Sequence, residues 1–172
     1  KLYQEFIDRG FTDPRVYSNY GVICKQTGRI NTAIKLLKKS ISLYPDNANT
    51  YLNLGNVLKQ IKKYEEALYF YKKAHELEPN IIESNINLAY ILIDIKKLSQ
   101  AKIFLQKAIE IGPVNPKLLI NLVKIQIELG ELKAAEINIH KVMHMDPNLE
   151  EAYSILGMIN INIQHTSASL IV

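Results

Sequence analysis

The chain has 172 residues, 48% of them hydrophobic and 22% charged, with 7 glycines and 6 prolines, a composition that belongs to folded proteins and excludes an intrinsically disordered segment. Its 21 basic and 17 acidic residues leave a net charge of +4, and the lysines are scattered without the dense runs of a nucleic-acid-binding arm, so we expect no nucleic-acid partner. The single cysteine, Cys24, excludes an intrachain disulfide and favours a reducing compartment, the cytoplasm. No apolar run approaches the roughly 18 residues that span a bilayer, so we expect no membrane partner.

A period of 34 residues runs through the sequence. Prolines recur at this step at Pro45, Pro79, Pro113 and Pro147, and alanines recur at Ala33, Ala67, Ala101 and Ala135. Repeats of this length are typical of stacked supersecondary units. We therefore expect four full units, at residues 14–47, 48–81, 82–115 and 116–149.

The first unit is preceded by residues 1–13, in which Tyr3 is in phase with Leu37 of the first unit. We expect this stretch to be the end of a preceding repeat, its second helix. Asp13 then stands directly before Pro14. Because aspartate is a favoured N-cap and proline fits the first turn, a new helix is predicted to begin here.

The second unit shows the predicted elements most clearly. Apolar and small residues recur at helical spacing from Tyr51 to Leu58, and the pattern resumes from Tyr64 after a break at Lys62. Each unit is therefore predicted to be a pair of helices.

Glycine marks this break in two of the four units, as Gly28 and Gly130. Glycine accepts the left-handed backbone conformation that ends many helices. Lys62 and Lys96 stand at the same place in the other two units. We expect those turns to carry strain or to adopt a different geometry.

The last segment departs from the period. Residues 150–163 are expected to be the first helix of a fifth repeat, and 164–172 to be an off-pattern tail. Ile155, Ile159 and Ile163 give an apolar face where a repeat array needs a polar end. We expect either that this sequence is a piece of a longer protein or that it forms a homo-oligomer through exposed ends.

These positions resemble the tetratricopeptide repeat (TPR) family, whose pattern combines an aromatic residue, Leu-Gly, later alanines and a closing proline. The second unit agrees nearly throughout, at Tyr51, Leu54, Gly55, Leu58, Ala67, Tyr71, Ala74 and Pro79. The third unit has Asn85 where the aromatic residue belongs, and the fourth has Gln126 at a position that usually packs. The resemblance implies an all-α fold, a right-handed TPR solenoid of antiparallel helix pairs with four full repeats and partial repeats at both ends.

One polar residue also recurs at the 34-residue step, in the first helix of each unit. This series, which we call the asparagine ladder, is Asn19, Asn53, Asn87 and Asn121. It lies off the packing seam, in line with Asn56. In the family, first helices line a concave groove, and the chain is similar to the TPR region of O-linked N-acetylglucosamine transferase, where such asparagines meet a peptide backbone. A side-chain amide both donates and accepts, so it can pair with any peptide unit.

The predicted function is therefore a non-catalytic protein-protein interaction module, a scaffold that binds an extended peptide or a flexible protein segment in the groove. Its predicted site residues are Asn19, Asn53, Asn56, Asn87, Tyr90, Asn121 and Lys124, with Lys59, Asp94 and Glu128 adding selectivity. Two alternatives stay open: the substrate-recruiting TPR arm of a larger glycosyltransferase or sulfotransferase, and a scaffold that self-assembles through uncapped ends. Duplicated repeats also inherit unused residues, so the ladder could be a solvated relic.

Other chemistry has weaker support in the sequence. A carboxylate clamp, a second binding mode of the family, needs basic or amide residues where Ser18 and Glu83 stand, so we do not expect it. His140 and His144 follow Glu136 at metal-ligand spacing, but no fourth ligand converges, and we expect neither a metal nor another cofactor. No Ser-His-Asp order or glycine-rich phosphate loop occurs, so we do not expect an enzyme.

Overall fold

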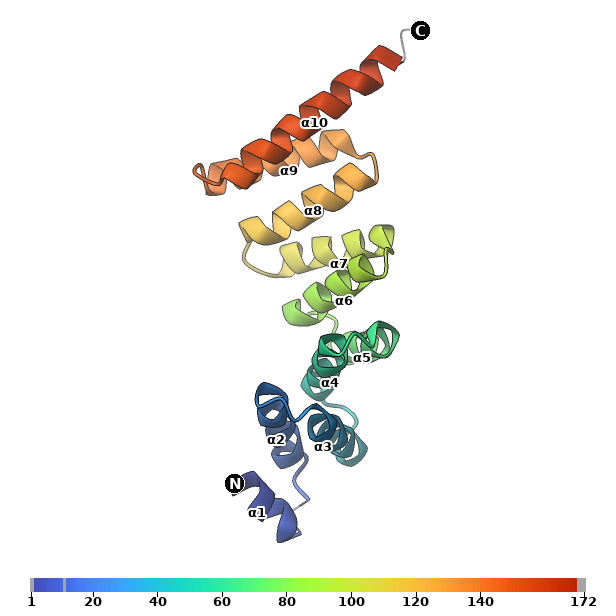
Figure 1. Cartoon of the computed structure of the whole chain (residues 1–172), viewed down its shortest axis with the longest axis vertical. Coiled ribbons are helices and arrows are strands. Elements are labelled where there is room, and N and C mark those ends of the chain that lie inside the picture. Colours follow the sequence, from blue (N-terminus) through green and yellow to red (C-terminus); the bar gives the residue numbers. More distant parts are fainter. Residues whose placement is uncertain (1, 11, 170–172) are drawn as a thin grey trace. The chain divides into compact units, whose positions relative to one another are not determined.

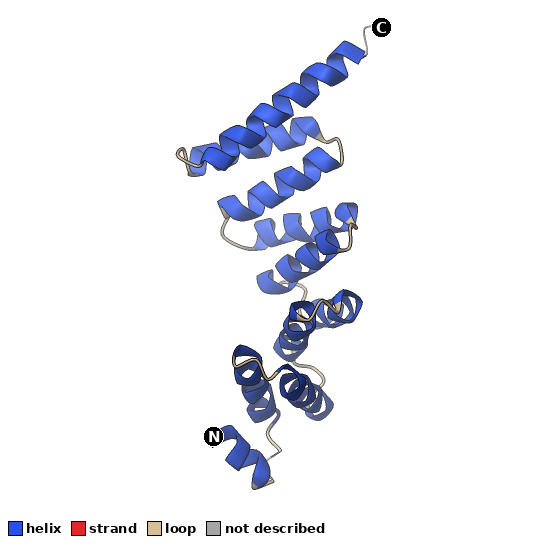
Figure 2. Cartoon of the chain, in the orientation of Figure 1, coloured by secondary structure: helices blue, strands red, loops and turns tan. Residues whose placement is uncertain are grey.

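The computed structural model describes residues 2–10 and 12–169, and every regular element within them is an α-helix (Figures 1 and 2). The helices are α1 (Leu2–Asp8), α2 (Pro14–Gln26), α3 (Ile30–Leu43), α4 (Ala48–Gln60), α5 (Tyr64–Leu77), α6 (Ile82–Asp94), α7 (Leu98–Ile111), α8 (Pro116–Glu128), α9 (Leu132–Met145) and α10 (Glu150–Ser169). From α2 to α9, helices of 13 and 14 residues alternate. This is the all-α arrangement of helix pairs that the period predicts. None of the described helices has the length and apolar character needed to cross a membrane.

The helices belong to two compact units. Unit 1, Lys1–Ile95, contains α1 to α6, and unit 2, Lys96–Val172, contains α7 to α10. In unit 1, α2 packs against α3 and α4 packs against α5. Leu37, Leu54 and Tyr71 fill its interior and are fully buried.

In unit 2 the interior lies among α8, α9 and α10. Val123, Ile139, Ile155 and Ile159 belong to one buried cluster there. This corrects the expectation that Ile155 and Ile159 form an exposed apolar end, because both side chains pack within the unit. Among the α10 side chains whose burial the structure describes, the exposed large apolar residues are Tyr153, Met158 and Ile161.

The turn between the two helices of a pair has the same geometry with glycine and with lysine. Gly28 and Gly130 have φ of 75°, and Lys62 and Lys96 have φ of 61°. After α4, the Lys63 N–H donates to the Leu58 carbonyl at 3.0 Å and the Lys62 N–H donates to the Lys59 carbonyl at 2.9 Å. These two bonds form a Schellman motif. The lysine turns therefore adopt the strained left-handed conformation and not a different geometry.

Side-chain caps mark three of the helix starts. Asp13 accepts from the Arg15 N–H at 2.8 Å, Asn115 accepts from the Lys117 N–H at 2.8 Å, and Asn47 accepts from the Thr50 N–H at 3.2 Å. The first is the predicted cap before Pro14, and Asn115 stands before Pro116 in the same way. The Arg15 side chain also donates to the Asp13 carboxylate, and these bonds lower the pKa of Asp13.

The C-terminal helix runs further than the repeat pattern predicts. A first helix was expected over 150–163, but α10 continues to Ser169. The repeat positions that end the earlier first helices hold a glycine or lysine turn, and this segment has neither a glycine nor a proline after Gly157. Nothing in its sequence therefore breaks the helix.

Candidate functional site

The first three asparagines of the ladder lie on successive first helices of unit 1. Asn19 is on α2 and is exposed, whereas Asn53 on α4 and Asn87 on α6 are half-buried. Together with Asn56 and Tyr90, which are also half-buried, they form what we call the first-helix face of unit 1. None of the five is fully buried.

Asn56 joins three helices of unit 1 through hydrogen bonds. Its Oδ1 accepts from the Tyr71 hydroxyl of α5 at 2.8 Å and from the Asn87 Nδ2 of α6 at 3.2 Å. Its own Nδ2 donates to the Glu83 Oε1 at 3.4 Å. The sequence predicted Asn56 as a ligand contact, but the structure gives this amide a second role in holding its neighbours.

These partners fix the orientation of the Asn87 amide. A carboxylate only accepts, so the Asn56 nitrogen faces Glu83 and the Asn56 oxygen faces Asn87 and Tyr71. Asn87 must then turn its nitrogen toward Asn56. Its oxygen, for which no bond occurs among the described residues, is left on the other side of the amide as an acceptor.

Tyr71 is suited to act as the donor in this network. Its side chain is fully buried, and burial, followed by the nearby carboxylates of Glu83 and Asp94, raises its pKa far above the ordinary value of 10.0. The phenol therefore stays protonated over the whole physiological range.

Lys59 and Tyr90 add a charged and an aromatic group to the first-helix face. The Lys59 ammonium lies 5.4 Å from the centre of the Tyr90 ring, within the range of a cation–π contact. The same ammonium lies 3.7 Å from the Asp94 carboxylate. The predicted selectivity residues of α4 and α6 are thus in contact with one another.

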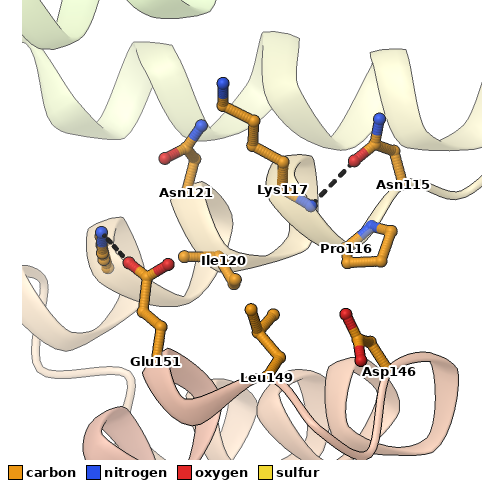
Figure 3. Close-up of a pocket in the computed structure, with 9 residues that line it drawn as sticks. Asn115, Pro116, Lys117, Ile120, Asn121, Asp146, Leu149 and Glu151 are labelled. Carbon is orange, nitrogen blue, oxygen red and sulfur yellow. Dashed lines mark hydrogen bonds and ion pairs between the residues drawn. The ribbon is translucent and has the colours of Figure 1, made fainter.

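Two more predicted site residues, Asn121 and Lys124, lie in unit 2 and line a cavity of about 410 Å³ beside α8. Lys117 and Asn121 project from the same side of α8, and Ile120 and Leu149 form the apolar floor (Figure 3). The Lys124 ammonium lines the cavity and is bonded to the Glu151 carboxylate at 2.7 Å. This pocket combines an apolar floor with amide and charged groups at its rim.

The predicted site is therefore brought together in two parts. Asn53, Asn56, Asn87 and Tyr90 gather in unit 1, and Asn121 lines the cavity of unit 2 with Lys124. The exposed Asn19 makes no side-chain hydrogen bond to another described residue. Glu128, on α8, is exposed and does not line the cavity.

Three residues that matter here were not predicted from the sequence. Tyr71 entered only as a position of the repeat pattern, Glu83 was considered only for the carboxylate clamp, and Glu151 was not considered. The sequence contained a signal for the two glutamates. Glu83 follows its partner Asn56 by 27 residues, Glu151 follows its partner Lys124 by 27 residues, and the two glutamates stand two repeats apart. A charged residue that recurs at the repeat period, at a fixed separation from a recurring polar residue, indicates a contact between neighbouring first helices.

The histidines of α9 have a different setting. His140 and His144 line an apolar hollow together with Val114, Leu119 and Ile137. Among the residues that the structure describes, no group of three or more His, Cys, Asp or Glu side chains could hold a metal ion.

Comparison with known proteins identifies the repeat. Two family profiles, both described as tetratricopeptide repeat, match residues 13–80 and 82–115, which together exceed half of the chain. No curated protein matches the sequence.

Solved structures of TPR proteins share the fold. YrrB, described as a TPR protein with an unusual peptide-binding site, aligns with a TM-score of 0.87 at 20% identity, covering 95% of this chain and 84% of that one. MamA from Desulfovibrio magneticus RS-1 aligns with a TM-score of 0.79 at 20% identity, covering 91% and 89%. The first TPR of Spaghetti, bound to the HSP90 peptide SRMEEVD, aligns with a TM-score of 0.66 at 21% identity, covering 69% and 94%. The repeat matches and this fold together show that the chain belongs to the tetratricopeptide repeat family.

Proposed function

We propose that the chain is a non-catalytic interaction module that binds an extended peptide through the first-helix face of unit 1. The observation that carries the proposal is the pair of half-buried amides at Asn53 and Asn87, one on each of two first helices and 34 residues apart. Two such amides can pair with peptide units of a strand lying across α4 and α6. The peptide-binding neighbours YrrB and Spaghetti support this class of function.

The hydrogen bonds around Asn56 determine which atom of Asn87 can bind a ligand. The Asn87 nitrogen is held by Asn56, so its oxygen is the atom offered to a ligand. A peptide N–H is the complementary group. The sequence resemblance to the TPR region of O-linked N-acetylglucosamine transferase suggests recognition through the peptide backbone, and this specific resemblance stays a prediction. A cytoplasmic location and self-association also stay predictions.

The first test measures what the amides contribute to binding. A peptide would be selected on the wild-type chain from a random-sequence display library, and its Kd measured by calorimetry for wild type and for the Asn53→Ala, Asn87→Ala double variant. Each hydrogen bond contributes about 0.5–1.5 kcal/mol, so the double variant should bind roughly 5- to 150-fold more weakly. The matched control is the Asn31→Ala, Asn80→Ala variant, which removes two exposed amides outside this face.

The second test separates backbone from side-chain recognition. Methylation of single backbone nitrogens in the selected peptide should weaken binding by about 2- to 13-fold at one or two positions, because an N-methyl amide cannot donate to Asn87. Alanine substitution along the same peptide should cost little. An unchanged Kd for the double asparagine variant would end the proposal, and strong loss from side-chain truncation alone would end its backbone mode.

A further inference from the structure

Unit 2 has a second hollow that the proposed function does not use. It lies against α9, has a volume of about 650 Å³, and we call it the α9 groove. Its lining includes Val114, Leu119, Ile137, Lys141, His144 and Met145. All of its residues lie in unit 2, on the segment before α8, the start of α8 and the face of α9 that carries Ile137.

The apolar side chains of this groove are unusually open to solvent. Ile137 is 59% exposed, Val114 50% and Met145 42%. Single exposed apolar residues are ordinary, but a contiguous group around a hollow marks an interaction surface. The burial of these three side chains by a partner would remove a large apolar area from water.

Among the residues that line the groove, the formal charge comes from Lys141 and is positive. Lys141, His140 and His144 line it, and no Asp or Glu does. Two acidic residues are adjacent to lining residues in the sequence: Glu136, beside Ile137, does not line the groove, and Asp146, beside Met145, lines the other cavity of unit 2. Ile137, Lys141 and His144 stand at i, i+4 and i+7 of α9, so the apolar anchor and the basic groups follow one stripe, about 10 Å long.

We propose that the α9 groove docks an acidic amphipathic segment of a partner protein. Apolar side chains of that segment contact Val114, Ile137 and Met145, and its carboxylates face Lys141 and the histidines. The match of charge sign selects this occupant over a basic one. The site is separate from the first-helix face of unit 1, so the Asn53→Ala, Asn87→Ala variant should bind such a segment with unchanged affinity.

The test uses two synthetic amphipathic helical peptides of about four turns, one with leucine and glutamate and one with leucine and lysine. Binding to the whole chain is measured by fluorescence anisotropy at low and high salt. The glutamate peptide should bind at least about tenfold more tightly than the lysine peptide, and its affinity should fall as salt rises. Equal binding of the two peptides, or no binding of the glutamate peptide, would overturn the proposal.

Two variants locate the site. Ile137→Asp should weaken binding of the glutamate peptide by about tenfold or more, because it places a carboxylate in the groove. The control is Ile103→Asp, at the same repeat position of α7, where the isoleucine is 61% exposed but does not line the groove. Both isoleucines are open to solvent, so both variants should keep the circular dichroism of wild type. An equal loss in both variants would show a general apolar surface and would contradict the docking groove.

Discussion

Lys62 and Lys96 occupy a backbone conformation for which their repeat equivalents use glycine. At φ of 61° a side chain with a Cβ is strained by about 1–2 kcal/mol, and glycine is not. The hydrogen bonds of the turn do not involve the lysine side chain. We therefore expect Lys62→Gly to raise the free energy of unfolding by about 0.5–1 kcal/mol, after the entropic cost of glycine in the unfolded chain is subtracted.

Urea unfolding followed by circular dichroism measures this gain. The control is Lys72→Gly, at an exposed lysine in the middle of α5, which should lower the free energy of unfolding by about 1 kcal/mol. Lysine-to-glycine substitution should thus raise the free energy of unfolding at Lys62 and lower it at Lys72, although the two lysines are only ten residues apart in the sequence. A loss of stability at Lys62 would mean that its side chain contributes more than the strain costs.

Tyr71 links stability to alkaline pH. Burial raises its pKa above the ordinary value of 10.0, so at high pH the unfolded chain releases a proton that the folded chain keeps. The unfolded state then binds fewer protons, and the free energy of unfolding falls as pH rises above about 10, by up to about 1.4 kcal/mol per pH unit. Below that pH the contribution of Tyr71 is fully present.

The measurement compares the pH dependence of urea unfolding for wild type and Tyr71→Phe between about pH 9 and pH 11. The variant should be less stable by about 1 kcal/mol at neutral pH, because it loses the bond to Asn56, but its decline with pH should be shallower. Tyr69→Phe is the control, since that ring is 55% exposed in the same helix. If the free energy of unfolding falls with pH at the same slope in wild type and Tyr71→Phe, Tyr71 is not the cause of the alkaline loss of stability.

At the scale of elements, the start of α6 shows how one repeat replaces the aromatic residue that the pattern requires. Asn85 is fully buried, and its Nδ2 donates to the Pro79 carbonyl at 3.0 Å and to the Ile81 carbonyl at 2.9 Å. Two repeats later, the Tyr153 hydroxyl donates to the Pro147 carbonyl at 2.9 Å. The two side chains differ in shape but make the same bond to the proline six residues before them.

We expect Asn85→Ala to destabilise the chain by about 2–3 kcal/mol. The change removes two hydrogen bonds, leaves two carbonyls near the start of α6 with fewer donors, and opens a small cavity. Chemical denaturation measures the loss. Asn80→Ala, at an exposed asparagine before the same helix, should change the stability by less than about 0.5 kcal/mol.

These elements show what the sequence could and could not supply. The helix pairs follow from the period, and the cap at Asp13 and the left-handed turns at Gly28 and Gly130 follow from local preferences, so all of these could be predicted. The Tyr71–Asn56–Asn87 bonds join three helices through residues 15 and 31 positions apart, and no local rule contains them. Helical spacing alone likewise does not separate Tyr69, which is 55% exposed, from Tyr71, which is fully buried.

At the scale of the whole molecule, the division into two compact units predicts how a local defect spreads. The stability of a repeat array is approximately the sum of terms for each repeat and its immediate neighbours. Gly55 offers a way to perturb one unit only. A Cβ there would lie 2.5 Å from the Tyr71 ring, which is buried and cannot swing aside, so Gly55→Ala should push α4 and α5 apart at a cost of about 1–3 kcal/mol.

Hydrogen exchange measured by mass spectrometry resolves where that cost appears. In Gly55→Ala, the amide protection of α4 and α5 should fall by about 5- to 150-fold, whereas that of α9 and α10 should stay as in wild type. Gly157→Ala is the control at the same repeat position of α10, where a Cβ meets nothing within 4 Å, so its protection should be unchanged or higher. An equal loss of protection in both units of Gly55→Ala would mean that the chain opens as one cooperative body, because only global unfolding exposes amides of unit 2 in response to a clash confined to unit 1.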